Sequence, residues 1–430
     1  MPARAAHAPS YYAATIPQRP PRAALEGTLK ADVAIVGAGF TGLNAALTLA
    51  EAGRRVVVLE AERVGWGATG RNGGQLHSGQ RRDQHYLEAQ YGPEMARRLW
   101  DLAEEAKALL HARAERHGID CDWMPGLIEA AHKKRFVTEE WDYAEKLSRD
   151  YGYEKLRPLG REALAEAIGT DVYHGGVRDM GGGHLHPLKL AEGLAEAVER
   201  AGGAIHETSR VVRLEHGPSG AVLTTDSGGR VEAEAVLLAG NGYLAGLDAA
   251  SEARVMPINN YILTSEPLTK TQADALIPGR EAVSDSRFVV YYWRLTNDRR
   301  LLFGGGETYR RGGPRDLESF VRAHLAKVYP ELAMVPASHV WGGTLAVTQT
   351  RLPAIRRTHP RVYVAAGFSG HGVAISGFSG HVVAQAILGD TDRFDVVSRL
   401  KTPPFPGGRM FRWPILALAM SWFSLRDRLW

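Results

Sequence analysis

A strand–turn–helix–strand unit near the start of the chain constrains the fold more than any other feature. The apolar run Val33–Val36 has the length and composition of a buried parallel strand. The turn Gly37–Gly42 follows it directly, with glycine at its first, third and sixth positions. Residues 43–52 then show helical periodicity, and a second apolar run, Val56–Leu59, leads into Glu60. The pattern is typical of the first half of a Rossmann-like α/β domain.

Each part of this unit suits the binding of a dinucleotide. The first glycine permits a tight turn, the second lets the backbone approach a pyrophosphate, and the third lets the helix pack closely on the strand. The N-terminus of the helix offers N–H groups and partial positive charge to phosphates, and the acidic residue can accept hydrogen bonds from a ribose. The alternative is that the glycines serve packing alone. The expected contacts are Gly37, Ala38, Gly39, Phe40, Thr41, Gly42, Glu60 and Ala61.

The segment after this unit favours FAD over a nicotinamide cofactor. Residues 65–75 read G-W-G-A-T-G-R-N-G-G-Q, which is a long flexible loop where a nicotinamide dehydrogenase usually has an ordinary crossover. Such a loop would fold over a dinucleotide, and Arg71 would bring positive charge to a phosphate. We therefore expect the loop to belong to the cofactor site.

The rest of the chain alternates between two kinds of segment. Nucleotide-type segments lie at 32–75, 187–242 and 355–390, whereas 255–266 and 286–306 alternate and carry aromatics, as antiparallel strands do. Helices are expected at 93–117, 138–150 and 187–201. The predicted division is an FAD-binding domain over 31–85, 180–250 and 341–395, a substrate domain over 86–179 and 251–340, an N-terminal arm over 1–30 and an apolar, basic tail over 396–430.

Composition excludes several classes of protein. The 52 Lys+Arg and 48 Asp+Glu residues give a net charge of only +4, so we expect no nucleic acid partner. A single cysteine, Cys121, excludes an intrachain disulfide, an iron–sulfur cluster and a cysteine-rich zinc site, and fits a cytoplasmic protein. His184 and His186 have no acidic or cysteine cluster beside them, so we expect a structural role for the pair and no metal. No apolar stretch has the length of a confident transmembrane span.

Motifs along almost the whole chain resemble those of the glycine/D-amino-acid oxidase (DAO) superfamily of flavoproteins, and within it the γ-glutamylputrescine oxidase-like branch. The resemblance implies an α/β fold, with a Rossmann-like FAD-binding domain and an inserted antiparallel-sheet substrate domain (α+β). The matching segments are Ser10–Tyr12, Gly37–Gly42, Glu60, Gly67–Gln75, Gly240–Gly242, Trp341–Gly343, Arg351–Pro353, Gly367–Gly372 and Pro404–Arg409.

The resemblance also implies where FAD would lie. The 67–75 loop would run beside the pyrophosphate to the isoalloxazine, the backbone at Val212 would meet adenine, and Gly367–Gly372 would face the pyrimidine end of the flavin. Some relatives attach FAD through a cysteine in the segment matching 341–350, and since this chain has none there we expect noncovalent FAD. The further implied contacts are Gly67, Ala68, Thr69, Arg71, Asn72, Gly73, Gly74, Gln75, Val212, Gly240, Gly343, Gly370, His371, Gly372 and Val373.

The implied reaction is oxidation of a C–N bond of an amine by hydride transfer to flavin N5, after which the imine hydrolyses. His371 is the best polar candidate near the flavin, and aromatics would box an alkylamine by cation–π contact unless they fill the core instead. We predict a catalytic role for His371, Tyr292, Trp341 and Arg294, with Tyr261, Tyr291 and Trp293 as further aromatic candidates. No lysine occurs between Tyr291 and Gly306, which leaves open whether O₂ or another electron acceptor is used.

Three functions remain open at this point. The first is oxidation of a γ-glutamylputrescine-like or related amine. The second is a D-amino-acid or N-methyl-amino-acid dehydrogenase, in which Arg294 or Arg351 would bind the carboxylate. The third is a flavoprotein subunit without its own turnover. The apolar stretch 410–430, flanked by arginines, would form either an interfacial membrane helix or a terminal helix packed on protein, and the oligomeric state is not predicted.

Overall fold

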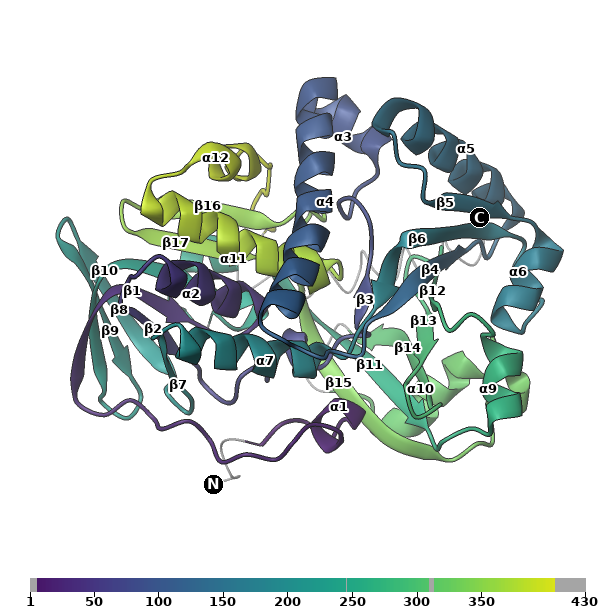
Figure 1. Ribbon diagram of the computed structural model, residues 1–430, viewed down its shortest axis with the longest axis horizontal. Helices are drawn as coiled ribbons and strands as arrows, with labels where there is room; N and C mark the ends of the chain where they lie inside the picture. Colours follow the sequence, from purple (N-terminus) through teal and green to yellow (C-terminus); the bar gives the residue numbers. More distant parts are fainter. Residues whose placement is uncertain (1–5, 245, 309–312, 407–430) are drawn as a thin grey trace.

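The chain folds around two β-sheets that lie side by side, each with its own helices (Figure 1). The computed structural model describes residues 6–244, 246–308 and 313–406. The mixed α/β architecture, a parallel sheet beside an antiparallel one, confirms the predicted fold class.

The first sheet is the predicted Rossmann-like sheet. Its main path runs β16-β17-β10-β1-β2-β7, and β1 pairs in parallel with β2 and with β10. The predicted buried strands thus lie at its centre, because they carry apolar side chains toward both faces. Its strands are β1 (Thr28–Val36), β2 (Val56–Leu59), β7 (Ala204–His206), β8 (Val211–Gly217), β9 (Gly220–Thr225), β10 (Arg230–Leu238), β16 (Ala354–His359) and β17 (Val362–Ala366).

Four helices pack together over one face of this sheet and build the largest apolar core. They are α2 (Phe40–Glu51), α4 (Pro93–Arg116), α7 (Pro187–Arg200) and α11 (Gly372–Leu388). α4 falls in the predicted substrate segment 86–179, yet Leu102, Ala103 and Ala106 on its apolar face are buried in this core. The hydrophobic stripe of the helix therefore places α4 with the first sheet.

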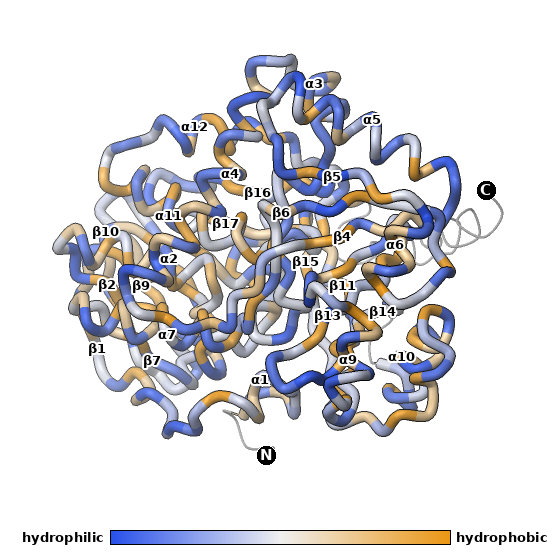
Figure 2. Tube along the Cα trace, turned by 45° about the vertical axis from the view of Figure 1, so that its right-hand side comes forward, coloured by the Kyte–Doolittle hydropathy of each residue, from blue (hydrophilic) through white to orange (hydrophobic). Residues whose placement is uncertain are grey.

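The second sheet is mainly antiparallel and follows the order β15-β11-β14-β13-β12-β4-β6-β3, with β5 paired to β6. The helix α5 (Lys134–Tyr151), which packs against β6, is mainly hydrophilic in Figure 2. Its strands are β3 (Gln75–Leu76), β4 (Met124–Ala130), β5 (Leu156–Leu159), β6 (Gly176–His184), β11 (Met256–Ser265), β12 (Ala282–Asp285), β13 (Tyr292–Leu295), β14 (Leu301–Thr308) and β15 (Ala337–Val347). The helices associated with it are α5 (Lys134–Tyr151), α6 (Arg161–Ile168), α9 (Lys270–Leu276) and α10 (Leu317–Leu325).

The two sheets share chain segments that the predicted division keeps apart. β3 lies in the predicted FAD-binding segment 31–85 and the start of segment 341–395 lies in β15, but both strands pair in the second sheet. β15 pairs with β11 along the whole length of β11, from Met256 to Ser265, and this pairing fixes β15 in the second sheet. These crossings bring cofactor-type segments and second-sheet strands together.

Short helices and 3-10 turns lie in the connections between the longer elements and near the two ends of the described chain. They are α1 (Tyr11–Ala14), α3 (Gln84–Tyr91), α8 (Ala249–Glu252), α12 (Asp392–Ser398), η1 (Ala68–Gly70), η2 (Asn241–Tyr243) and η3 (Pro330–Leu332). Within the described residues, no helix combines the length and the apolar character that crossing a bilayer requires. The predicted interfacial or terminal helix over 410–430 lies outside the described residues.

The N-terminal arm is held by a buried carboxylate. Glu207, whose side chain is fully buried, forms ion pairs with Arg19 at 2.9 Å and with Arg63 at 3.0 Å, and it also accepts a hydrogen bond from the backbone N–H of Arg22. The predicted extended arm is thus fixed along the first sheet, with one turn of helix at α1.

Candidate functional site

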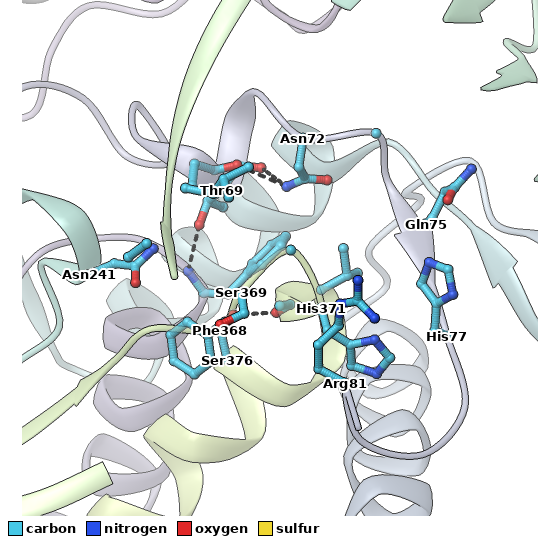
Figure 3. Close-up of a pocket in the computed structure, with 18 of the residues that line it drawn as sticks. Thr69, Asn72, Gln75, His77, Arg81, Asn241, Phe368, Ser369, His371 and Ser376 are labelled. Carbon is cyan, nitrogen blue, oxygen red and sulfur yellow. Dashed lines mark hydrogen bonds between the residues drawn. The ribbon is translucent and has the colours of Figure 1, made fainter. Parts of the chain in front are cut away.

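A continuous cavity of about 840 Å³ lies between the two sheets, and its walls come from both. One end is formed by the Gly-rich turn before α2 and by Glu60, Glu62 and Arg210 around the end of β2. The other end is formed by side chains on β4, β12 and α5 of the second sheet. The 67–75 loop and the start of α11 line the cavity between these ends, as Figure 3 shows.

The βαβ unit is built tightly at the first end. One Glu60 carboxylate oxygen accepts a hydrogen bond from the N–H of Ala38 at 2.7 Å, and the other accepts from the N–H of Glu62 at 2.9 Å. Burial raises the pKa of Glu60 to about 7, although the two backbone N–H groups oppose that shift. Gly37 has φ +105°, and a Cβ there would lie 2.9 Å from the carbonyl oxygen of Ala239, so a side chain cannot be accommodated at this turn.

The 67–75 loop is held from within and from the second sheet. Thr69 Oγ1 accepts a hydrogen bond from the N–H of Phe40 at 3.2 Å, and the Asn72 amide donates to the carbonyl oxygens of Ala68 and Thr69 (Figure 3). Arg71 lies over the Trp66 ring at 4.1 Å and donates to backbone carbonyls. The loop is therefore ordered against α2 instead of spanning open space.

The start of α11 faces the same cavity. No side-chain hydrogen bond caps this helix at His371. Ser369 fixes the preceding turn, because its hydroxyl accepts from the N–H of Thr348 at 3.2 Å and donates to the carbonyl of Gly367 at 3.1 Å. Buried serine and glycine positions further along α11 pack on α2, where a Cβ at Gly380 would lie 1.9 Å from the Thr41 carbonyl. The helix N-terminus thus presents backbone N–H groups and partial positive charge to the cavity.

Most of the predicted cofactor residues line this cavity. They are Gly37, Gly39, Phe40, Thr41, Glu60, Ala61, Gly67, Ala68, Thr69, Arg71, Asn72, Gly73, Gln75, Gly240, Gly343, Gly370, His371, Gly372 and Val373. Ala38, Gly42 and Gly74 lie behind this wall. Val212, whose backbone the resemblance places beside adenine, does not line the cavity: the residue is 56% exposed on β8, and the neighbouring Val211 lines the cavity.

Two of the four predicted catalytic residues lie behind the cavity wall. Arg294 is buried and donates to the carbonyl oxygen of Gly73 at 2.8 Å and to that of Leu185 at 3.1 Å. Trp341 is also buried, and its indole N–H donates to the carbonyl oxygen of Arg71 at 3.1 Å. Both side chains therefore hold the 67–75 loop, and neither lines the cavity.

The predicted aromatic box is mostly core. Tyr261, Tyr291 and Trp293 are buried in the second-sheet core, and the indole of Trp293 donates to Tyr329 at 2.9 Å. Tyr292 does line the cavity, where its hydroxyl donates to Asn260 Oδ1 at 2.5 Å. Side chains alternate between the two faces of a strand, so Tyr292 points to the cavity while its two neighbours point into the core.

The second-sheet end carries charged side chains that sequence reasoning missed. We call this part the charged compartment; it is lined by His77, Arg81, Glu129, Glu140, Tyr143 and Glu307. In the sequence, only His77 and Arg81 could have been linked to the site, because they follow directly after the Gly-rich 67–75 loop. The glutamates come from β4, α5 and β14 and show no motif in the sequence.

Two groups in the charged compartment lack a partner within the described part of the chain. The Arg81 guanidinium makes no hydrogen bond or ion pair there; its accessible surface faces the cavity, and enclosure by protein lowers its pKa to about 10. Oε2 of Glu140 is buried without a hydrogen bond among the same residues, and burial raises the pKa of this carboxyl to about 9. A guanidinium and a carboxyl group that both lack a hydrogen-bond partner in that part of the chain favour a polar ligand that would bind them.

The residues of the first end fit an FAD dinucleotide. The close backbone approach at Gly37, the start of α2 with glycine at its N-cap and the carboxylate of Glu60 match a pyrophosphate and a ribose. The start of α11 would stabilise negative charge on a reduced flavin. By contrast, no group of three or more His, Cys, Asp or Glu side chains placed to hold a metal occurs in the described ranges.

Comparisons with known proteins agree with this geometry. The family model described as "FAD dependent oxidoreductase" (DAO) matches residues 32–386. A probable oxidoreductase OrdL of Rhizobium meliloti is 42% identical, with 97% of each chain covered. A gamma-glutamylputrescine oxidoreductase of Escherichia coli is 40% identical, covering 98% of this chain and 99% of the relative. The crystal structure of glycine oxidase from Geobacillus kaustophilus superimposes with a TM-score of 0.69 at 24% identity, over 84% of this chain and 95% of that one.

Proposed function

Because the chain belongs to the DAO family of FAD-dependent oxidoreductases, we propose that it oxidises the primary amine of a γ-glutamylputrescine-like substrate with noncovalently bound FAD. The observation that carries this proposal is the continuity of the cavity, which joins the dinucleotide-binding end to the charged compartment. FAD, when bound, accepts the hydride from the carbon next to the amine, and the product imine then hydrolyses. The protein's task is to place that carbon and its nitrogen at the flavin.

The charges of the compartment support a substrate with a cationic amine and a zwitterionic head. Glu129 and Glu140 offer carboxyl groups to ammonium groups, and Arg81 offers an unpaired guanidinium to a carboxylate. A γ-glutamylated diamine carries both kinds of group. The relative that is 40% identical over almost its whole length bears the name of an enzyme for that substrate.

Noncovalent attachment is supported by the position of the cysteine. Cys121, the only cysteine of the chain, is buried in the core of the first sheet among the packed helices, and burial raises the pKa of its thiol to about 11. Acid precipitation of the protein should therefore release all of the flavin into the supernatant. Yellow colour that stays with the pellet would contradict noncovalent binding.

Anaerobic bleaching of the flavin by defined amines tests the proposal. γ-Glutamylputrescine should bleach the flavin faster than putrescine, which lacks the head group. γ-Glutamylbutylamide, which lacks the terminal amine, should not bleach it but should compete with the substrate. Reoxidation of the bleached protein by O₂ and by a dye then identifies the acceptor. Bleaching by D-amino acids with none by polyamine derivatives would overturn the proposed substrate.

Substitution of the unpaired arginine tests the head group separately. Arg81→Met should raise the apparent Kd for γ-glutamylputrescine by about 10-fold or more, because a desolvated charge pair is lost, and should change that for putrescine little. Arg82→Met is the matched control, since Arg82 donates to the carbonyl oxygen of Thr350 and does not line the cavity. Equal effects of the Arg81 change on both substrates would contradict a role in head-group binding.

An amino-acid substrate is the second candidate, and Arg81 is the observation that favours it. Arg294, one of the two arginines predicted to bind a carboxylate, is held behind the loop, whereas Arg351 lines the cavity together with Arg81. The same bleaching experiment with D-amino acids and N-methyl amino acids distinguishes the two candidates. Flavin that no amine or amino acid bleaches would instead indicate a flavoprotein subunit.

A further inference from the structure

His77 occupies the point where the cofactor segments meet the second sheet. It follows β3, which continues the 67–75 loop into that sheet, and its imidazole lines the cavity. Figure 3 shows His77 beside Gln75 at the edge of the pocket, near the start of α11. The His77 ring centroid lies 5.3 Å from that of His371. A substrate that reaches from the charged compartment to the flavin would pass this point.

A carboxylate orients the His77 ring. Nδ1 of His77 lies 3.1 Å from Oε1 of Glu129, and Oε2 of Glu129 accepts a hydrogen bond from the hydroxyl of Ser284 at 2.7 Å. The register of the parallel pair β4–β12 sets Ser284 opposite Glu129. Nδ1 therefore carries the proton that it donates to Glu129, which leaves Nε2 as the free acceptor of a neutral imidazole.

Glu129 is ionised at this site. Its side chain is 41% exposed, but that surface faces the cavity, and the surrounding protein still desolvates the carboxylate. This desolvation raises the pKa of Glu129, yet the interactions with His77, Ser284 and Arg81 together outweigh it, and the net direction is downward. A fixed negative charge therefore lies 3.1 Å from Nδ1 of His77.

The other cavity histidine has the opposite surroundings. Nε2 of His371 lies 2.9 Å from the carbonyl oxygen of Gly79, so that nitrogen must be the donor. Burial, with Arg81 and His77 nearby, lowers the pKa of His371 to about 3. His371, which the sequence favours as the polar catalytic residue, thus stays neutral and serves less well as a proton acceptor. Among the described residues that line the cavity, these two are the only histidines.

We propose that His77 removes the proton from the ammonium group of the bound substrate, with Glu129 as the residue that positions and stabilises the resulting imidazolium. The inference rests on the proposed amine oxidation, because only a neutral amine can release a hydride from its neighbouring carbon. One N–H bond of the ammonium breaks, the electron pair stays on the substrate nitrogen, and the proton forms a new N–H bond at Nε2. No electrons are exchanged in this step.

The groups that face His77 determine the expected pH dependence. Glu129 faces it from β4 and His371 from the start of α11, and Arg81, on the loop that follows β3, acts on His371. Arg81 opposes a positive charge in this region, and Glu129 favours it. Of these groups, Glu129 makes the direct contact with His77. Its negative charge is therefore placed to stabilise the proton that His77 would receive from the substrate.

Anaerobic bleaching by γ-glutamylputrescine between pH 6 and 10 tests the inference in the FAD-loaded protein. His77→Gln should lower the bleaching rate constant by about 10²–10⁴-fold near pH 7, and the rate should then rise with pH until the free amine itself is neutral. Added imidazole should restore part of the rate in His77→Ala. Glu129→Gln should slow bleaching less than His77→Gln does, and Glu129→Asp should recover part of that loss. His216→Gln on exposed β8 is the control for the same chemical change.

A binding measurement separates proton transfer from a structural role. tert-Butylamine has no hydrogen on the carbon next to nitrogen, so it binds without reaction, and its effect on the flavin spectrum reports its Kd. In the wild type the proton of the ammonium form passes to His77 and none is released to buffer, so the Kd for total amine should change little between pH 7 and 9, whereas in His77→Gln it should fall as pH rises toward the pKa of the amine. If γ-glutamylputrescine fails to bleach the wild type, the proposed function fails. If it bleaches wild type and His77→Gln with the same pH profile, the proton-transfer inference fails alone.

Discussion

Replacing Gly42 with alanine tests whether the turn before α2 is built to hold a pyrophosphate. A Cβ at this position would lie 1.9 Å from the carbonyl oxygen of Gly37 and 3.2 Å from Cγ2 of Ile35. Ordinary van der Waals contact begins at 3.4 Å, so the carbonyl contact is 1.5 Å too short. The near atom is backbone and cannot rotate away. The first turn of α2 must therefore move away from the Gly37 turn.

The displacement should affect both folding and cofactor binding. Overpacking of a tight interior contact lowers the free energy of unfolding by about 1–3 kcal/mol. The same shift would separate the turn at Gly37 from the start of α2, whose backbone N–H groups would face a bound pyrophosphate. A loss of about 1.4 kcal/mol in binding would weaken FAD affinity tenfold, and we expect at least that loss for Gly42→Ala.

Urea unfolding of the apoprotein and quenching of FAD fluorescence measure the two effects. Gly217→Ala is the matched control: Gly217 lies at the end of β8, and a Cβ there meets no atom within 4 Å. The control should unfold and bind FAD as the wild type does. Stability and FAD affinity of Gly42→Ala equal to those of the control would refute the close approach of helix and turn.

Three further substitutions test other contacts. Burial raises the pKa of Glu60 to about 7, and ribose hydroxyls that donate to it would favour the ionised form, so FAD affinity should rise from pH 6 to pH 8 in the wild type and stay constant in Glu60→Gln. Burial would raise the pKa of Glu207, but hydrogen bonds and ion pairs, first from Arg19, outweigh it and lower this pKa to about 2. Glu207→Gln should therefore lower the free energy of unfolding by about 3 kcal/mol at pH 7. The difference in urea midpoint between the wild type and the variant should shrink as pH falls from 4.5 toward 2. Arg294→Met should lower the flavin content of the purified protein and leave the KM for amine within about twofold, since Arg294 holds the loop at Gly73; a raised KM at full flavin content would support the catalytic role that the sequence suggests.

Local signals explain why the cofactor end of the site could be predicted. The turn Gly37–Gly42, the helix that it opens and Glu60 all lie within one short stretch, and their geometry depends mainly on neighbouring residues. The strand β1 and the helix α2 consequently appear where the pattern places them. The predicted helix 187–201 is confirmed as α7 for the same reason: Pro187 begins it, and its apolar face repeats with helical spacing.

The charged compartment could not be predicted because its residues meet only through tertiary pairing. Glu129 and Ser284 are separated by 155 positions, and the parallel pairing of β4 with β12 brings them together. Neither β12 nor its partner strand carries a recognisable motif. The orientation of Arg294 could not be predicted for a related reason. This residue lies on a strand that borders the cavity, but its side chain donates to the carbonyl oxygens of Gly73 and Leu185.

The two ends of the cavity recognise their ligands by different means, and this difference has consequences for variants. At the FAD-binding end the chain contributes mainly backbone, through the turn at Gly37 and the starts of α2 and α11, so side-chain changes there are limited by space. In the charged compartment, recognition depends on side chains such as Arg81 and Glu140, which line the cavity and keep polar atoms without a hydrogen-bond partner within the described residues. Changes on β4, β12 and α5 can therefore alter the preferred amine while FAD stays bound. Changes in the Gly-rich segments should reduce FAD binding and activity toward every amine together.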